Sequence, residues 1–141
     1  MADEGEIVMD RDINCAGMLL RRAQRRNLLA LDSALAHYGT NMAQWAVLKA
    51  MAEQPGLTGH ALAARTLQSD QALGTLVTPL VTRGLVARTR TGNKLAHSLT
   101  DSGRELLAVT EATVSTTLEQ RMAALDGKQI DELCGLLELI A

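Results

Sequence analysis

Basic side chains cluster around one short turn of this sequence. Arg88 and Arg90 precede a Gly92-Asn93 pair, and Lys94 follows it. Glycine and asparagine supply the positive φ angles that the tight turn of a β-hairpin requires. Guanidinium and ammonium groups at the tip of a hairpin are suited to contact the phosphate groups of a nucleic acid. The segment is therefore a candidate phosphate-binding hairpin.

Small polar residues form a second candidate surface just before this hairpin. A helix is predicted over residues 70–82, because leucine and valine recur there at helical spacing. The opposite side of this helix carries Gln71, Gly74, Thr75, Thr78 and Thr82. Small side chains allow a helix to approach the bases of DNA closely, and glutamine can form two hydrogen bonds with an adenine edge. An ordinary solvent-exposed helix face explains the same pattern equally well.

The elements around these residues predict a helix-turn-helix. Thr58 is expected to cap a short helix over residues 59–67, and Ser69 or Asp70 to cap the next helix after a brief turn. Gly84 ends this second helix, and the hairpin follows directly. A helix-turn-helix with an attached hairpin is a winged helix-turn-helix, in which the second helix is presented to a groove of DNA.

Long helices with apolar stripes are predicted on both sides of this unit. Residues 11–37 have small or apolar side chains at helical spacing, Thr100 caps a helix over residues 101–125, and a last helix follows Asp126-Gly127. Such stripes would stay exposed on a single chain, which predicts a second copy that covers them. The fold class is thus mostly α with a small β-hairpin wing, and the N- and C-terminal helices form a dimerisation region.

The predicted elements divide the chain into four parts. These are a flexible acidic tail at 1–10, an N-terminal dimerisation helix at 11–38, a winged helix-turn-helix DNA-binding region at 39–100 and C-terminal dimerisation helices at 101–141. The total of 141 residues is enough for one domain. No apolar run reaches the roughly 20 residues of a membrane span, and the acidic N-terminus is unlike a signal peptide. A cytoplasmic protein that does not enter membranes is therefore expected.

The charge of the chain is unevenly distributed. The formal net charge is −2 at pH 7. Residues 58–104 nevertheless carry six basic and only two acidic side chains, whereas residues 105–141 carry two basic and seven acidic ones. This local excess predicts an anionic partner for the middle of the chain.

The residues that carry enzyme chemistry are scattered. His37, His60 and His97 lie in no metal-ligand motif, and no Ser/His/Asp arrangement, carboxylate pair or phosphate-binding glycine loop is present in the sequence. The sequence predicts no enzyme, no cofactor and no metal site. Cys15 and Cys134 are expected to be small buried side chains, although a redox-sensing thiol at Cys15 is an alternative.

The order of these motifs resembles the MarR family of transcriptional regulators over about residues 11–141. The matching segments are Gln44-Trp45-Ala46-Val47-Leu48, Pro55-Gly56-Leu57-Thr58, Leu62-Ala63 with Arg65, Leu76-Val77, Leu80, Arg83-Gly84-Leu85-Val86-Ala87-Arg88 and Ser98-Leu99-Thr100-Asp101-Ser102-Gly103. The resemblance implies a homodimer that binds double-stranded DNA at a pseudo-palindromic operator. It implies a repressor that is released by a small-molecule effector.

The resemblance also implies which residues meet the partners. The recognition helix would contact DNA through Ser69, Gln71, Ala72, Gly74 and Thr75, and Thr78 lies on the same line. The wing would use Arg90, Asn93 and Lys94, and Arg88 is expected near its tip as well. A small aromatic or phenolic effector would bind between the dimerisation helices and the winged helix-turn-helix. Candidate residues for that effector pocket are Met18, Arg22, Met42, Trp45 and His60.

Three features depart from the family pattern. No basic residue occurs between Thr66 and Thr82, Pro79 stands inside the recognition helix, and the wing is short and lacks an Asp-x-Arg pair. A proline within a helix costs ~3 kcal/mol and kinks it. More of the DNA affinity would then come from the wing and from Arg65. A winged-helix module that binds a protein and has weakened or lost operator binding is the alternative.

Overall fold

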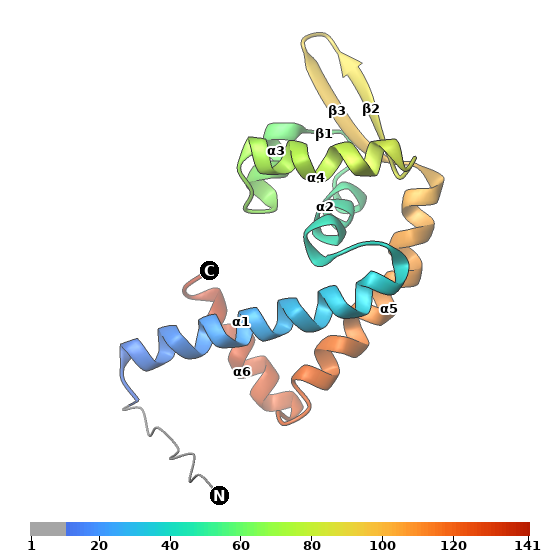
Figure 1. Ribbon diagram of the computed structural model, residues 1–141. Helices are drawn as coiled ribbons and strands as arrows, with labels where there is room; N and C mark the ends of the chain where they lie inside the picture. Colours follow the sequence, from blue (N-terminus) through green and yellow to red (C-terminus); the bar gives the residue numbers. More distant parts are fainter. Residues whose placement is uncertain (1–10) are drawn as a thin grey trace, which may run out of the picture.

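The computed structural model describes residues 11–141, and the predicted acidic tail at 1–10 lies outside the described residues. Helices dominate the described part of the chain (Figure 1). The elements in chain order are α1 (Ile13–Leu35), the 3-10 helix η1 (Ala36–Tyr38), α2 (Met42–Glu53), β1 (Leu57–Thr58), α3 (Gly59–Arg65), α4 (Asp70–Thr82), β2 (Val86–Thr91), β3 (Lys94–Leu99), α5 (Asp101–Arg121) and α6 (Gly127–Glu138).

The predicted helix starts are confirmed by side-chain caps. The side chains of Thr58, Ser69 and Thr100 accept hydrogen bonds from the backbone N–H groups three residues further on. Asn41 caps α2 in the same way, and Asp126 forms a capping box with Gln129 at the start of α6. Each cap pairs a backbone N–H group that the helix itself leaves without a partner. The local sequence thus determines where these helices begin.

Two predicted helix ends are wrong by a few residues. The first helix of the helix-turn-helix ends at Arg65 and not at residue 67, because Leu67 adopts the left-handed conformation with φ of 56°. The helix predicted to end at residue 125 ends at Arg121. Glycine is the residue that usually ends a helix in the left-handed conformation, so a leucine gives no such signal in the sequence.

The small sheet has one strand more than the predicted hairpin. β1 pairs with β3 in antiparallel register, and the strand order is β1-β3-β2. A strand of two residues has no periodic pattern that a sequence could reveal. In the hairpin, Thr91 lies opposite Lys94. Gly92 between them has a positive φ of 62°, but Asn93 does not, so the expectation that both turn residues supply positive φ is wrong for asparagine. Figure 1 shows this hairpin projecting from the body as a wing.

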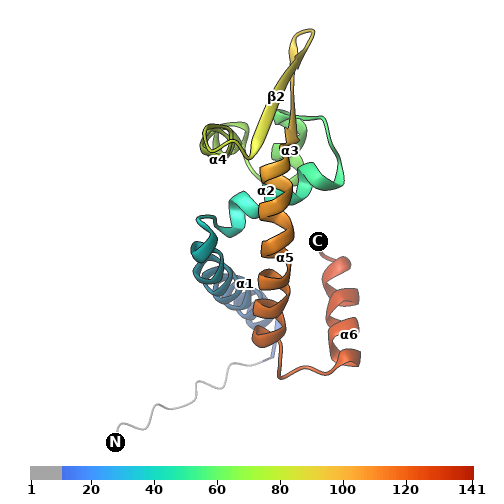
Figure 2. The same cartoon turned by 90° about the vertical axis from the view of Figure 1, so that its right-hand side faces the viewer.

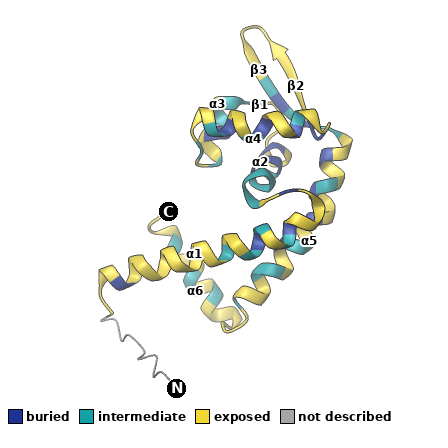
Figure 3. Ribbon diagram, in the orientation of Figure 1, coloured by how far each residue is buried: buried dark blue, intermediate teal, exposed yellow. Residues whose placement is uncertain are grey.

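The main core lies inside the winged unit. It is built from apolar side chains of α2, α3, α4, the sheet and the start of α5. Leu48, Leu62 and Leu80 are fully buried at its centre. Helix α4 continues through Pro79 to Thr82, so the proline lies in the last turn and does not end the helix. The opposite side of α4 is exposed (Figure 3).

The long helices form a second unit below the winged unit. Helices α1 and α5 pack against each other through Leu31, Leu35 and Val114. The first half of α1 is largely exposed, and α6 contains no buried residue. In Figure 2, α6 stands apart from α5 and is joined to it by a short loop. Within residues 11–141, no helix is long and apolar enough to cross a membrane.

Candidate nucleic-acid interface

Helix α4 presents the predicted line of small polar residues to solvent. Leu73, Val77 and Leu80 are buried on its inner side. The outer side is exposed at Gln71, Gly74, Thr75, Thr78 and Thr82. The helical spacing of the apolar residues therefore fixes which face of α4 is free for a partner.

The three threonines on this face bond back to their own helix. The hydroxyl groups of Thr75, Thr78 and Thr82 donate to the carbonyl oxygens of Gln71, Gly74 and Thr78 over 3.2, 2.9 and 3.1 Å. Such bonds to the residue four positions earlier use the only hydrogen that a hydroxyl group can donate. Each hydroxyl oxygen keeps lone pairs that can still accept a hydrogen bond.

Two side-chain contacts stabilise the start of α4. The Ser69 hydroxyl oxygen accepts a hydrogen bond from the backbone N–H of Ala72 over 3.1 Å. Ala72 itself is only partly exposed. The carboxylate of Asp70 lies 3.1 Å from Nδ1 of His60 at the start of α3. Both of these side chains are mostly exposed, so this contact contributes little to stability.

The wing brings positive charge next to α4. A guanidinium nitrogen of Arg88 lies 3.5 Å from the hydroxyl oxygen of Thr78, at the long limit for a hydrogen bond. Arg90, Asn93 and Lys94 are exposed further out on the hairpin. Within residues 11–141, the side chains of Arg90 and Lys94 make no ion pair, so their charges are free for an anionic partner.

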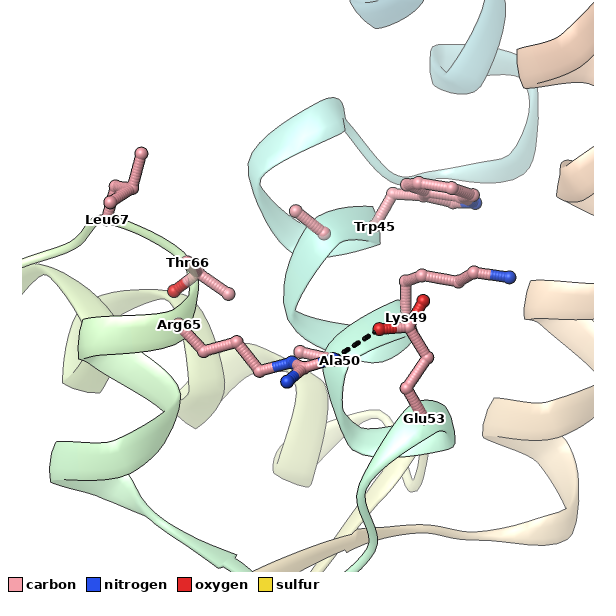
Figure 4. Close-up of a pocket in the computed structure, with 8 residues that line it drawn as sticks. Trp45, Lys49, Ala50, Glu53, Arg65, Thr66 and Leu67 are labelled. Carbon is pink, nitrogen blue, oxygen red and sulfur yellow. Dashed lines mark hydrogen bonds and ion pairs between the residues drawn. The ribbon is translucent and has the colours of Figure 1, made fainter. Parts of the chain in front are cut away.

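Arg65 at the end of α3 is paired with a carboxylate. Its guanidinium group forms an ion pair of 2.6 Å with the carboxylate of Glu53 on α2. Figure 4 shows this pair beside Trp45 and Lys49, at a shallow hollow between α2 and the end of α3. A role of Arg65 in DNA binding stays a prediction, and Glu53 would compete with a phosphate group for its charge.

The hollow beside this ion pair has a volume of about 420 Å³. Its lining residues are Trp45, Ala46, Lys49, Ala50, Glu53, Arg65, Thr66 and Leu67. Lys49 also forms an ion pair of 2.6 Å with Glu111 on α5, and this hydrogen bond raises the pKa of the Lys49 ammonium group. The indole N–H of Trp45 donates to the Thr110 hydroxyl oxygen on α5 over 3.1 Å. The hollow itself lies between α2 and the end of α3, and two of its lining side chains, Trp45 and Lys49, also contact α5.

The structure separates the five candidate effector residues. Met42 and Trp45 pack together against the cluster of α1 and α5. Met18 and Arg22 are exposed on the first half of α1, and His60 pairs with Asp70 at the start of α3. Only Trp45 of the five lines the hollow. Sequence patterns missed Lys49 and Glu53, because charged residues on an amphipathic helix are usually only solvent-exposed.

The surroundings of Cys15 do not favour a reactive thiol. Cys15 is buried, and its backbone N–H donates a hydrogen bond to the Asp12 carboxylate over 2.9 Å. This bond lowers the pKa of Asp12, which keeps a negative charge near the start of the helix. Burial leaves the Cys15 thiol little contact with solvent, so the redox-sensing alternative gains no support from its surroundings. Cys134 is exposed, which contradicts the expectation that both cysteines are buried.

Among the described residues, no group of three His, Cys, Asp or Glu side chains is placed to hold a metal ion.

The short helix, the turn, the exposed helix α4 and the adjoining basic hairpin together define a winged helix-turn-helix protein. The MarR family model matches residues 38–94. The HTH-type transcriptional repressor Rv2887 of Mycobacterium tuberculosis is 30% identical over 125 residues, which cover 86% of this chain and 90% of that repressor. The chain therefore belongs to the MarR family.

Solved structures agree with this assignment over nearly the whole chain. The crystal structure of the M. tuberculosis protein in complex with DNA is similar, with a TM-score of 0.79 at 28% identity. The similarity covers 94% of this chain and 99% of the M. tuberculosis chain. A MarR family transcriptional regulator from Rhodococcus sp. RHA1 has a TM-score of 0.86 at 25% identity and covers 93% of this chain and 96% of its own.

Proposed function

We propose that this protein is a dimeric DNA-binding repressor of the MarR family. The exposed face of α4 beside a wing with exposed Arg90 and Lys94 is the observation that carries this proposal. Helix α4 enters the major groove, and the wing contacts phosphate groups next to it. The similar M. tuberculosis protein is named a transcriptional repressor and has a solved DNA complex, which supports the same role here. Action on chromosomal DNA agrees with the expected cytoplasmic location, and no catalytic step is part of this role.

We propose that α1 and α6 of two copies pack together. An apolar hollow of about 330 Å³ lies between these helices. Its lining residues are Ala16, Leu19, Leu20, Ala23, Leu133, Leu137 and Ile140. Exposed apolar surfaces of this kind usually mark an interface between proteins. A two-fold dimer would present two α4 helices to a pseudo-palindromic operator.

We propose that a small aromatic acid binds in the hollow at Trp45. Structures of the similar M. tuberculosis protein include complexes with salicylic acid and p-aminosalicylic acid. Here the indole ring offers an aromatic surface, and Lys49 and Arg65 offer positive charge for a carboxylate (Figure 4). Both cations are already paired with carboxylates, so a ligand must compete with Glu53 or Glu111. Its binding would thus change the contacts between α2, α3 and α5.

Selection of bound fragments from random duplex DNA at moderate salt tests the proposal. We expect two half-sites whose centres are about one helical turn, ~10 base pairs, apart. Arg90→Ala and Lys94→Ala should weaken binding to all sequences and lower the salt slope by about one for each lost phosphate contact. Lys128→Ala removes a basic charge from α6 instead, and should leave the slope unchanged. A full-length protein that binds no duplex would favour the alternative, a module that binds another protein.

A further inference from the structure

We propose that α4 recognises A·T base pairs by contact between its threonine methyl groups and the 5-methyl groups of thymine. This inference rests on the proposed DNA-binding function and specifies which bases it reads. It starts from the hydrogen bonds of the exposed face of α4. Thr75, Thr78 and Thr82 donate their hydroxyl hydrogens to carbonyl oxygens of their own helix. Toward a partner, each side chain therefore offers a methyl group and an oxygen that accepts.

The face has few hydrogen-bond donors for a base. Guanine presents two acceptors in the major groove, and proteins usually bind them with arginine or lysine. Helix α4, from Asp70 to Thr82, contains neither residue. The side-chain amide of Gln71 is the one donor on the exposed line that no hydrogen bond within residues 11–141 uses. Glutamine pairs best with adenine, because it can donate to N7 and accept from the N6 amino group.

An A·T pair offers what such a face can bind. In the major groove, adenine presents an N6 amino donor, and thymine adds a methyl group. The donor suits the free lone pairs of a threonine oxygen, and the methyl group suits the threonine methyl. A G·C pair likewise offers two acceptors and one amino donor, so the feature that it lacks is the methyl group. The chemistry of α4 therefore favours A·T pairs.

Gly74 is compatible with close contact with a partner. It lies within α4, where glycine costs roughly 1 kcal/mol relative to alanine. A Cβ atom built at Gly74 would meet no other atom within 4 Å, and its φ is not positive. Neither packing nor backbone conformation within the described residues thus requires glycine there. The missing side chain does, however, leave room for the helix backbone to approach a base pair.

Thr75 is the best residue for a test. Thr78 lies within 3.5 Å of Arg88, so its substitution would also disturb the wing. Thr75 has no contact with the wing among the hydrogen bonds of the described part of the chain, and it lies one residue from Gly74. Thr75→Ser keeps the hydroxyl group and removes the methyl group. Thr75→Val keeps a methyl group and removes the hydroxyl group.

The experiment uses the full chain and a duplex obtained by selection. Thymines in each half-site are replaced one at a time by deoxyuridine, which pairs identically but lacks the methyl group. We expect at least one replacement to weaken binding about three- to fivefold, the effect of one buried methyl-sized group. Thr75→Ser should abolish the effect of one such replacement, whereas Thr75→Val should retain it. Thr117→Ser, which removes a methyl from a threonine bonded in the same way on α5, is the matched control.

The outcomes separate this inference from the proposed function. Equal affinity for thymine and deoxyuridine duplexes, or selected half-sites with G·C pairs at their centres, would overturn the inference while DNA binding stands. Failure to bind any duplex would overturn both. Gly74→Ala gives a second readout: it should raise the melting temperature of the free protein and weaken binding to the selected duplex. A variant that is stabilised and binds with unchanged affinity would contradict close approach at Gly74.

Discussion

The guanidinium group of Arg83 donates a hydrogen bond to the backbone carbonyl oxygen of Gly39 over 2.7 Å. Arg83 is the residue directly after α4, and Gly39 lies between η1 and α2. Gly39 has a φ of 69°, and a Cβ atom there would lie 3.3 Å from a guanidinium nitrogen of Arg83. A hydrogen bond thus joins the end of α4 to the segment that connects the long helix α1 with the winged unit.

We expect Arg83→Ala to weaken DNA binding more than it lowers stability. The lost hydrogen bond is exposed and contributes ~0.5–1.5 kcal/mol to folding. Its loss also frees the end of α4 relative to α2. Chemical denaturation and duplex binding, measured on the same variant, check this. Gly39→Ala should be the more destabilising change, because the left-handed conformation costs roughly 1–2 kcal/mol in a residue with a side chain. An Arg83→Ala variant with unchanged affinity would contradict the expected role.

Thr110 is predicted to hold Trp45 in place. Its side chain is fully buried on α5, and its hydroxyl oxygen accepts the hydrogen bond of the Trp45 indole N–H. Thr110→Val keeps the volume but removes the acceptor, so it should destabilise the fold by about 1–3 kcal/mol. Urea denaturation measures this loss. Thr110→Ser retains the acceptor and should lose less, and the reverse order would show that volume matters more than the hydrogen bond.

Gly103 is predicted to tolerate no side chain. A Cβ atom there would lie 2.1 Å from the carbonyl oxygen of Leu85, which is backbone and cannot rotate away. Gly103→Ala must therefore push α5 away from the start of the wing, at a cost of about 1–3 kcal/mol or more. Thermal unfolding of this variant measures the loss. Gly135→Ala on α6, where a Cβ atom would meet nothing within 4 Å, is the matched control and should not lower the melting temperature.

His97 is predicted to make the fold less stable as the pH is lowered. Burial lowers the pKa of His97 below its usual 6.5, and the positive charge of Arg88 on the neighbouring strand lowers it further, against a hydrogen bond to the Leu57 carbonyl. The folded state therefore binds a proton less readily than the unfolded state. The free energy of unfolding should be constant above about pH 7 and should decrease as the pH falls through 6.5.

Denaturation at several pH values between 7.5 and 5.5 measures this decrease. The His97→Gln variant should lose most of the pH dependence, even if it is less stable at every pH. His37→Gln removes an exposed histidine and should retain the dependence. If the free energy of unfolding decreases equally in the wild-type and His97→Gln proteins, the pH dependence arises from other groups.

Much of the fold could be predicted from the sequence, because local signals define it. Thr58, Ser69 and Thr100 are side-chain caps at positions that the sequence marks, and the leucine and valine spacing of α4 determines its buried face. The strand β1 could not be predicted, because it is stabilised only by pairing with β3. The early end of α3 depends on the conformation of Leu67, which its residue type does not indicate.

The candidate site was predictable only in part. The exposed line on α4 and the unpaired charges of Arg90 and Lys94 follow from periodicity and turn chemistry. The ion pair of Arg65 with Glu53 joins residues from two helices, and no sequence pattern specifies such a contact. The proposed effector hollow likewise depends on the position of α2 against the end of α3. Contacts between distant segments are set by packing, so they require the structure.

Helix α6 buries none of its residues, and a capping box at Asp126 stabilises its first turn. A helix of twelve residues has little stability of its own in water. Its partly buried apolar residues face α1 of the same chain, and we expect the proposed second copy to stabilise it further, so that its folded state depends on concentration. We expect proteases to trim the C-terminus of dilute samples first and to spare the winged unit. The length of the fragment that survives digestion would then show whether α6 is covered by a second copy.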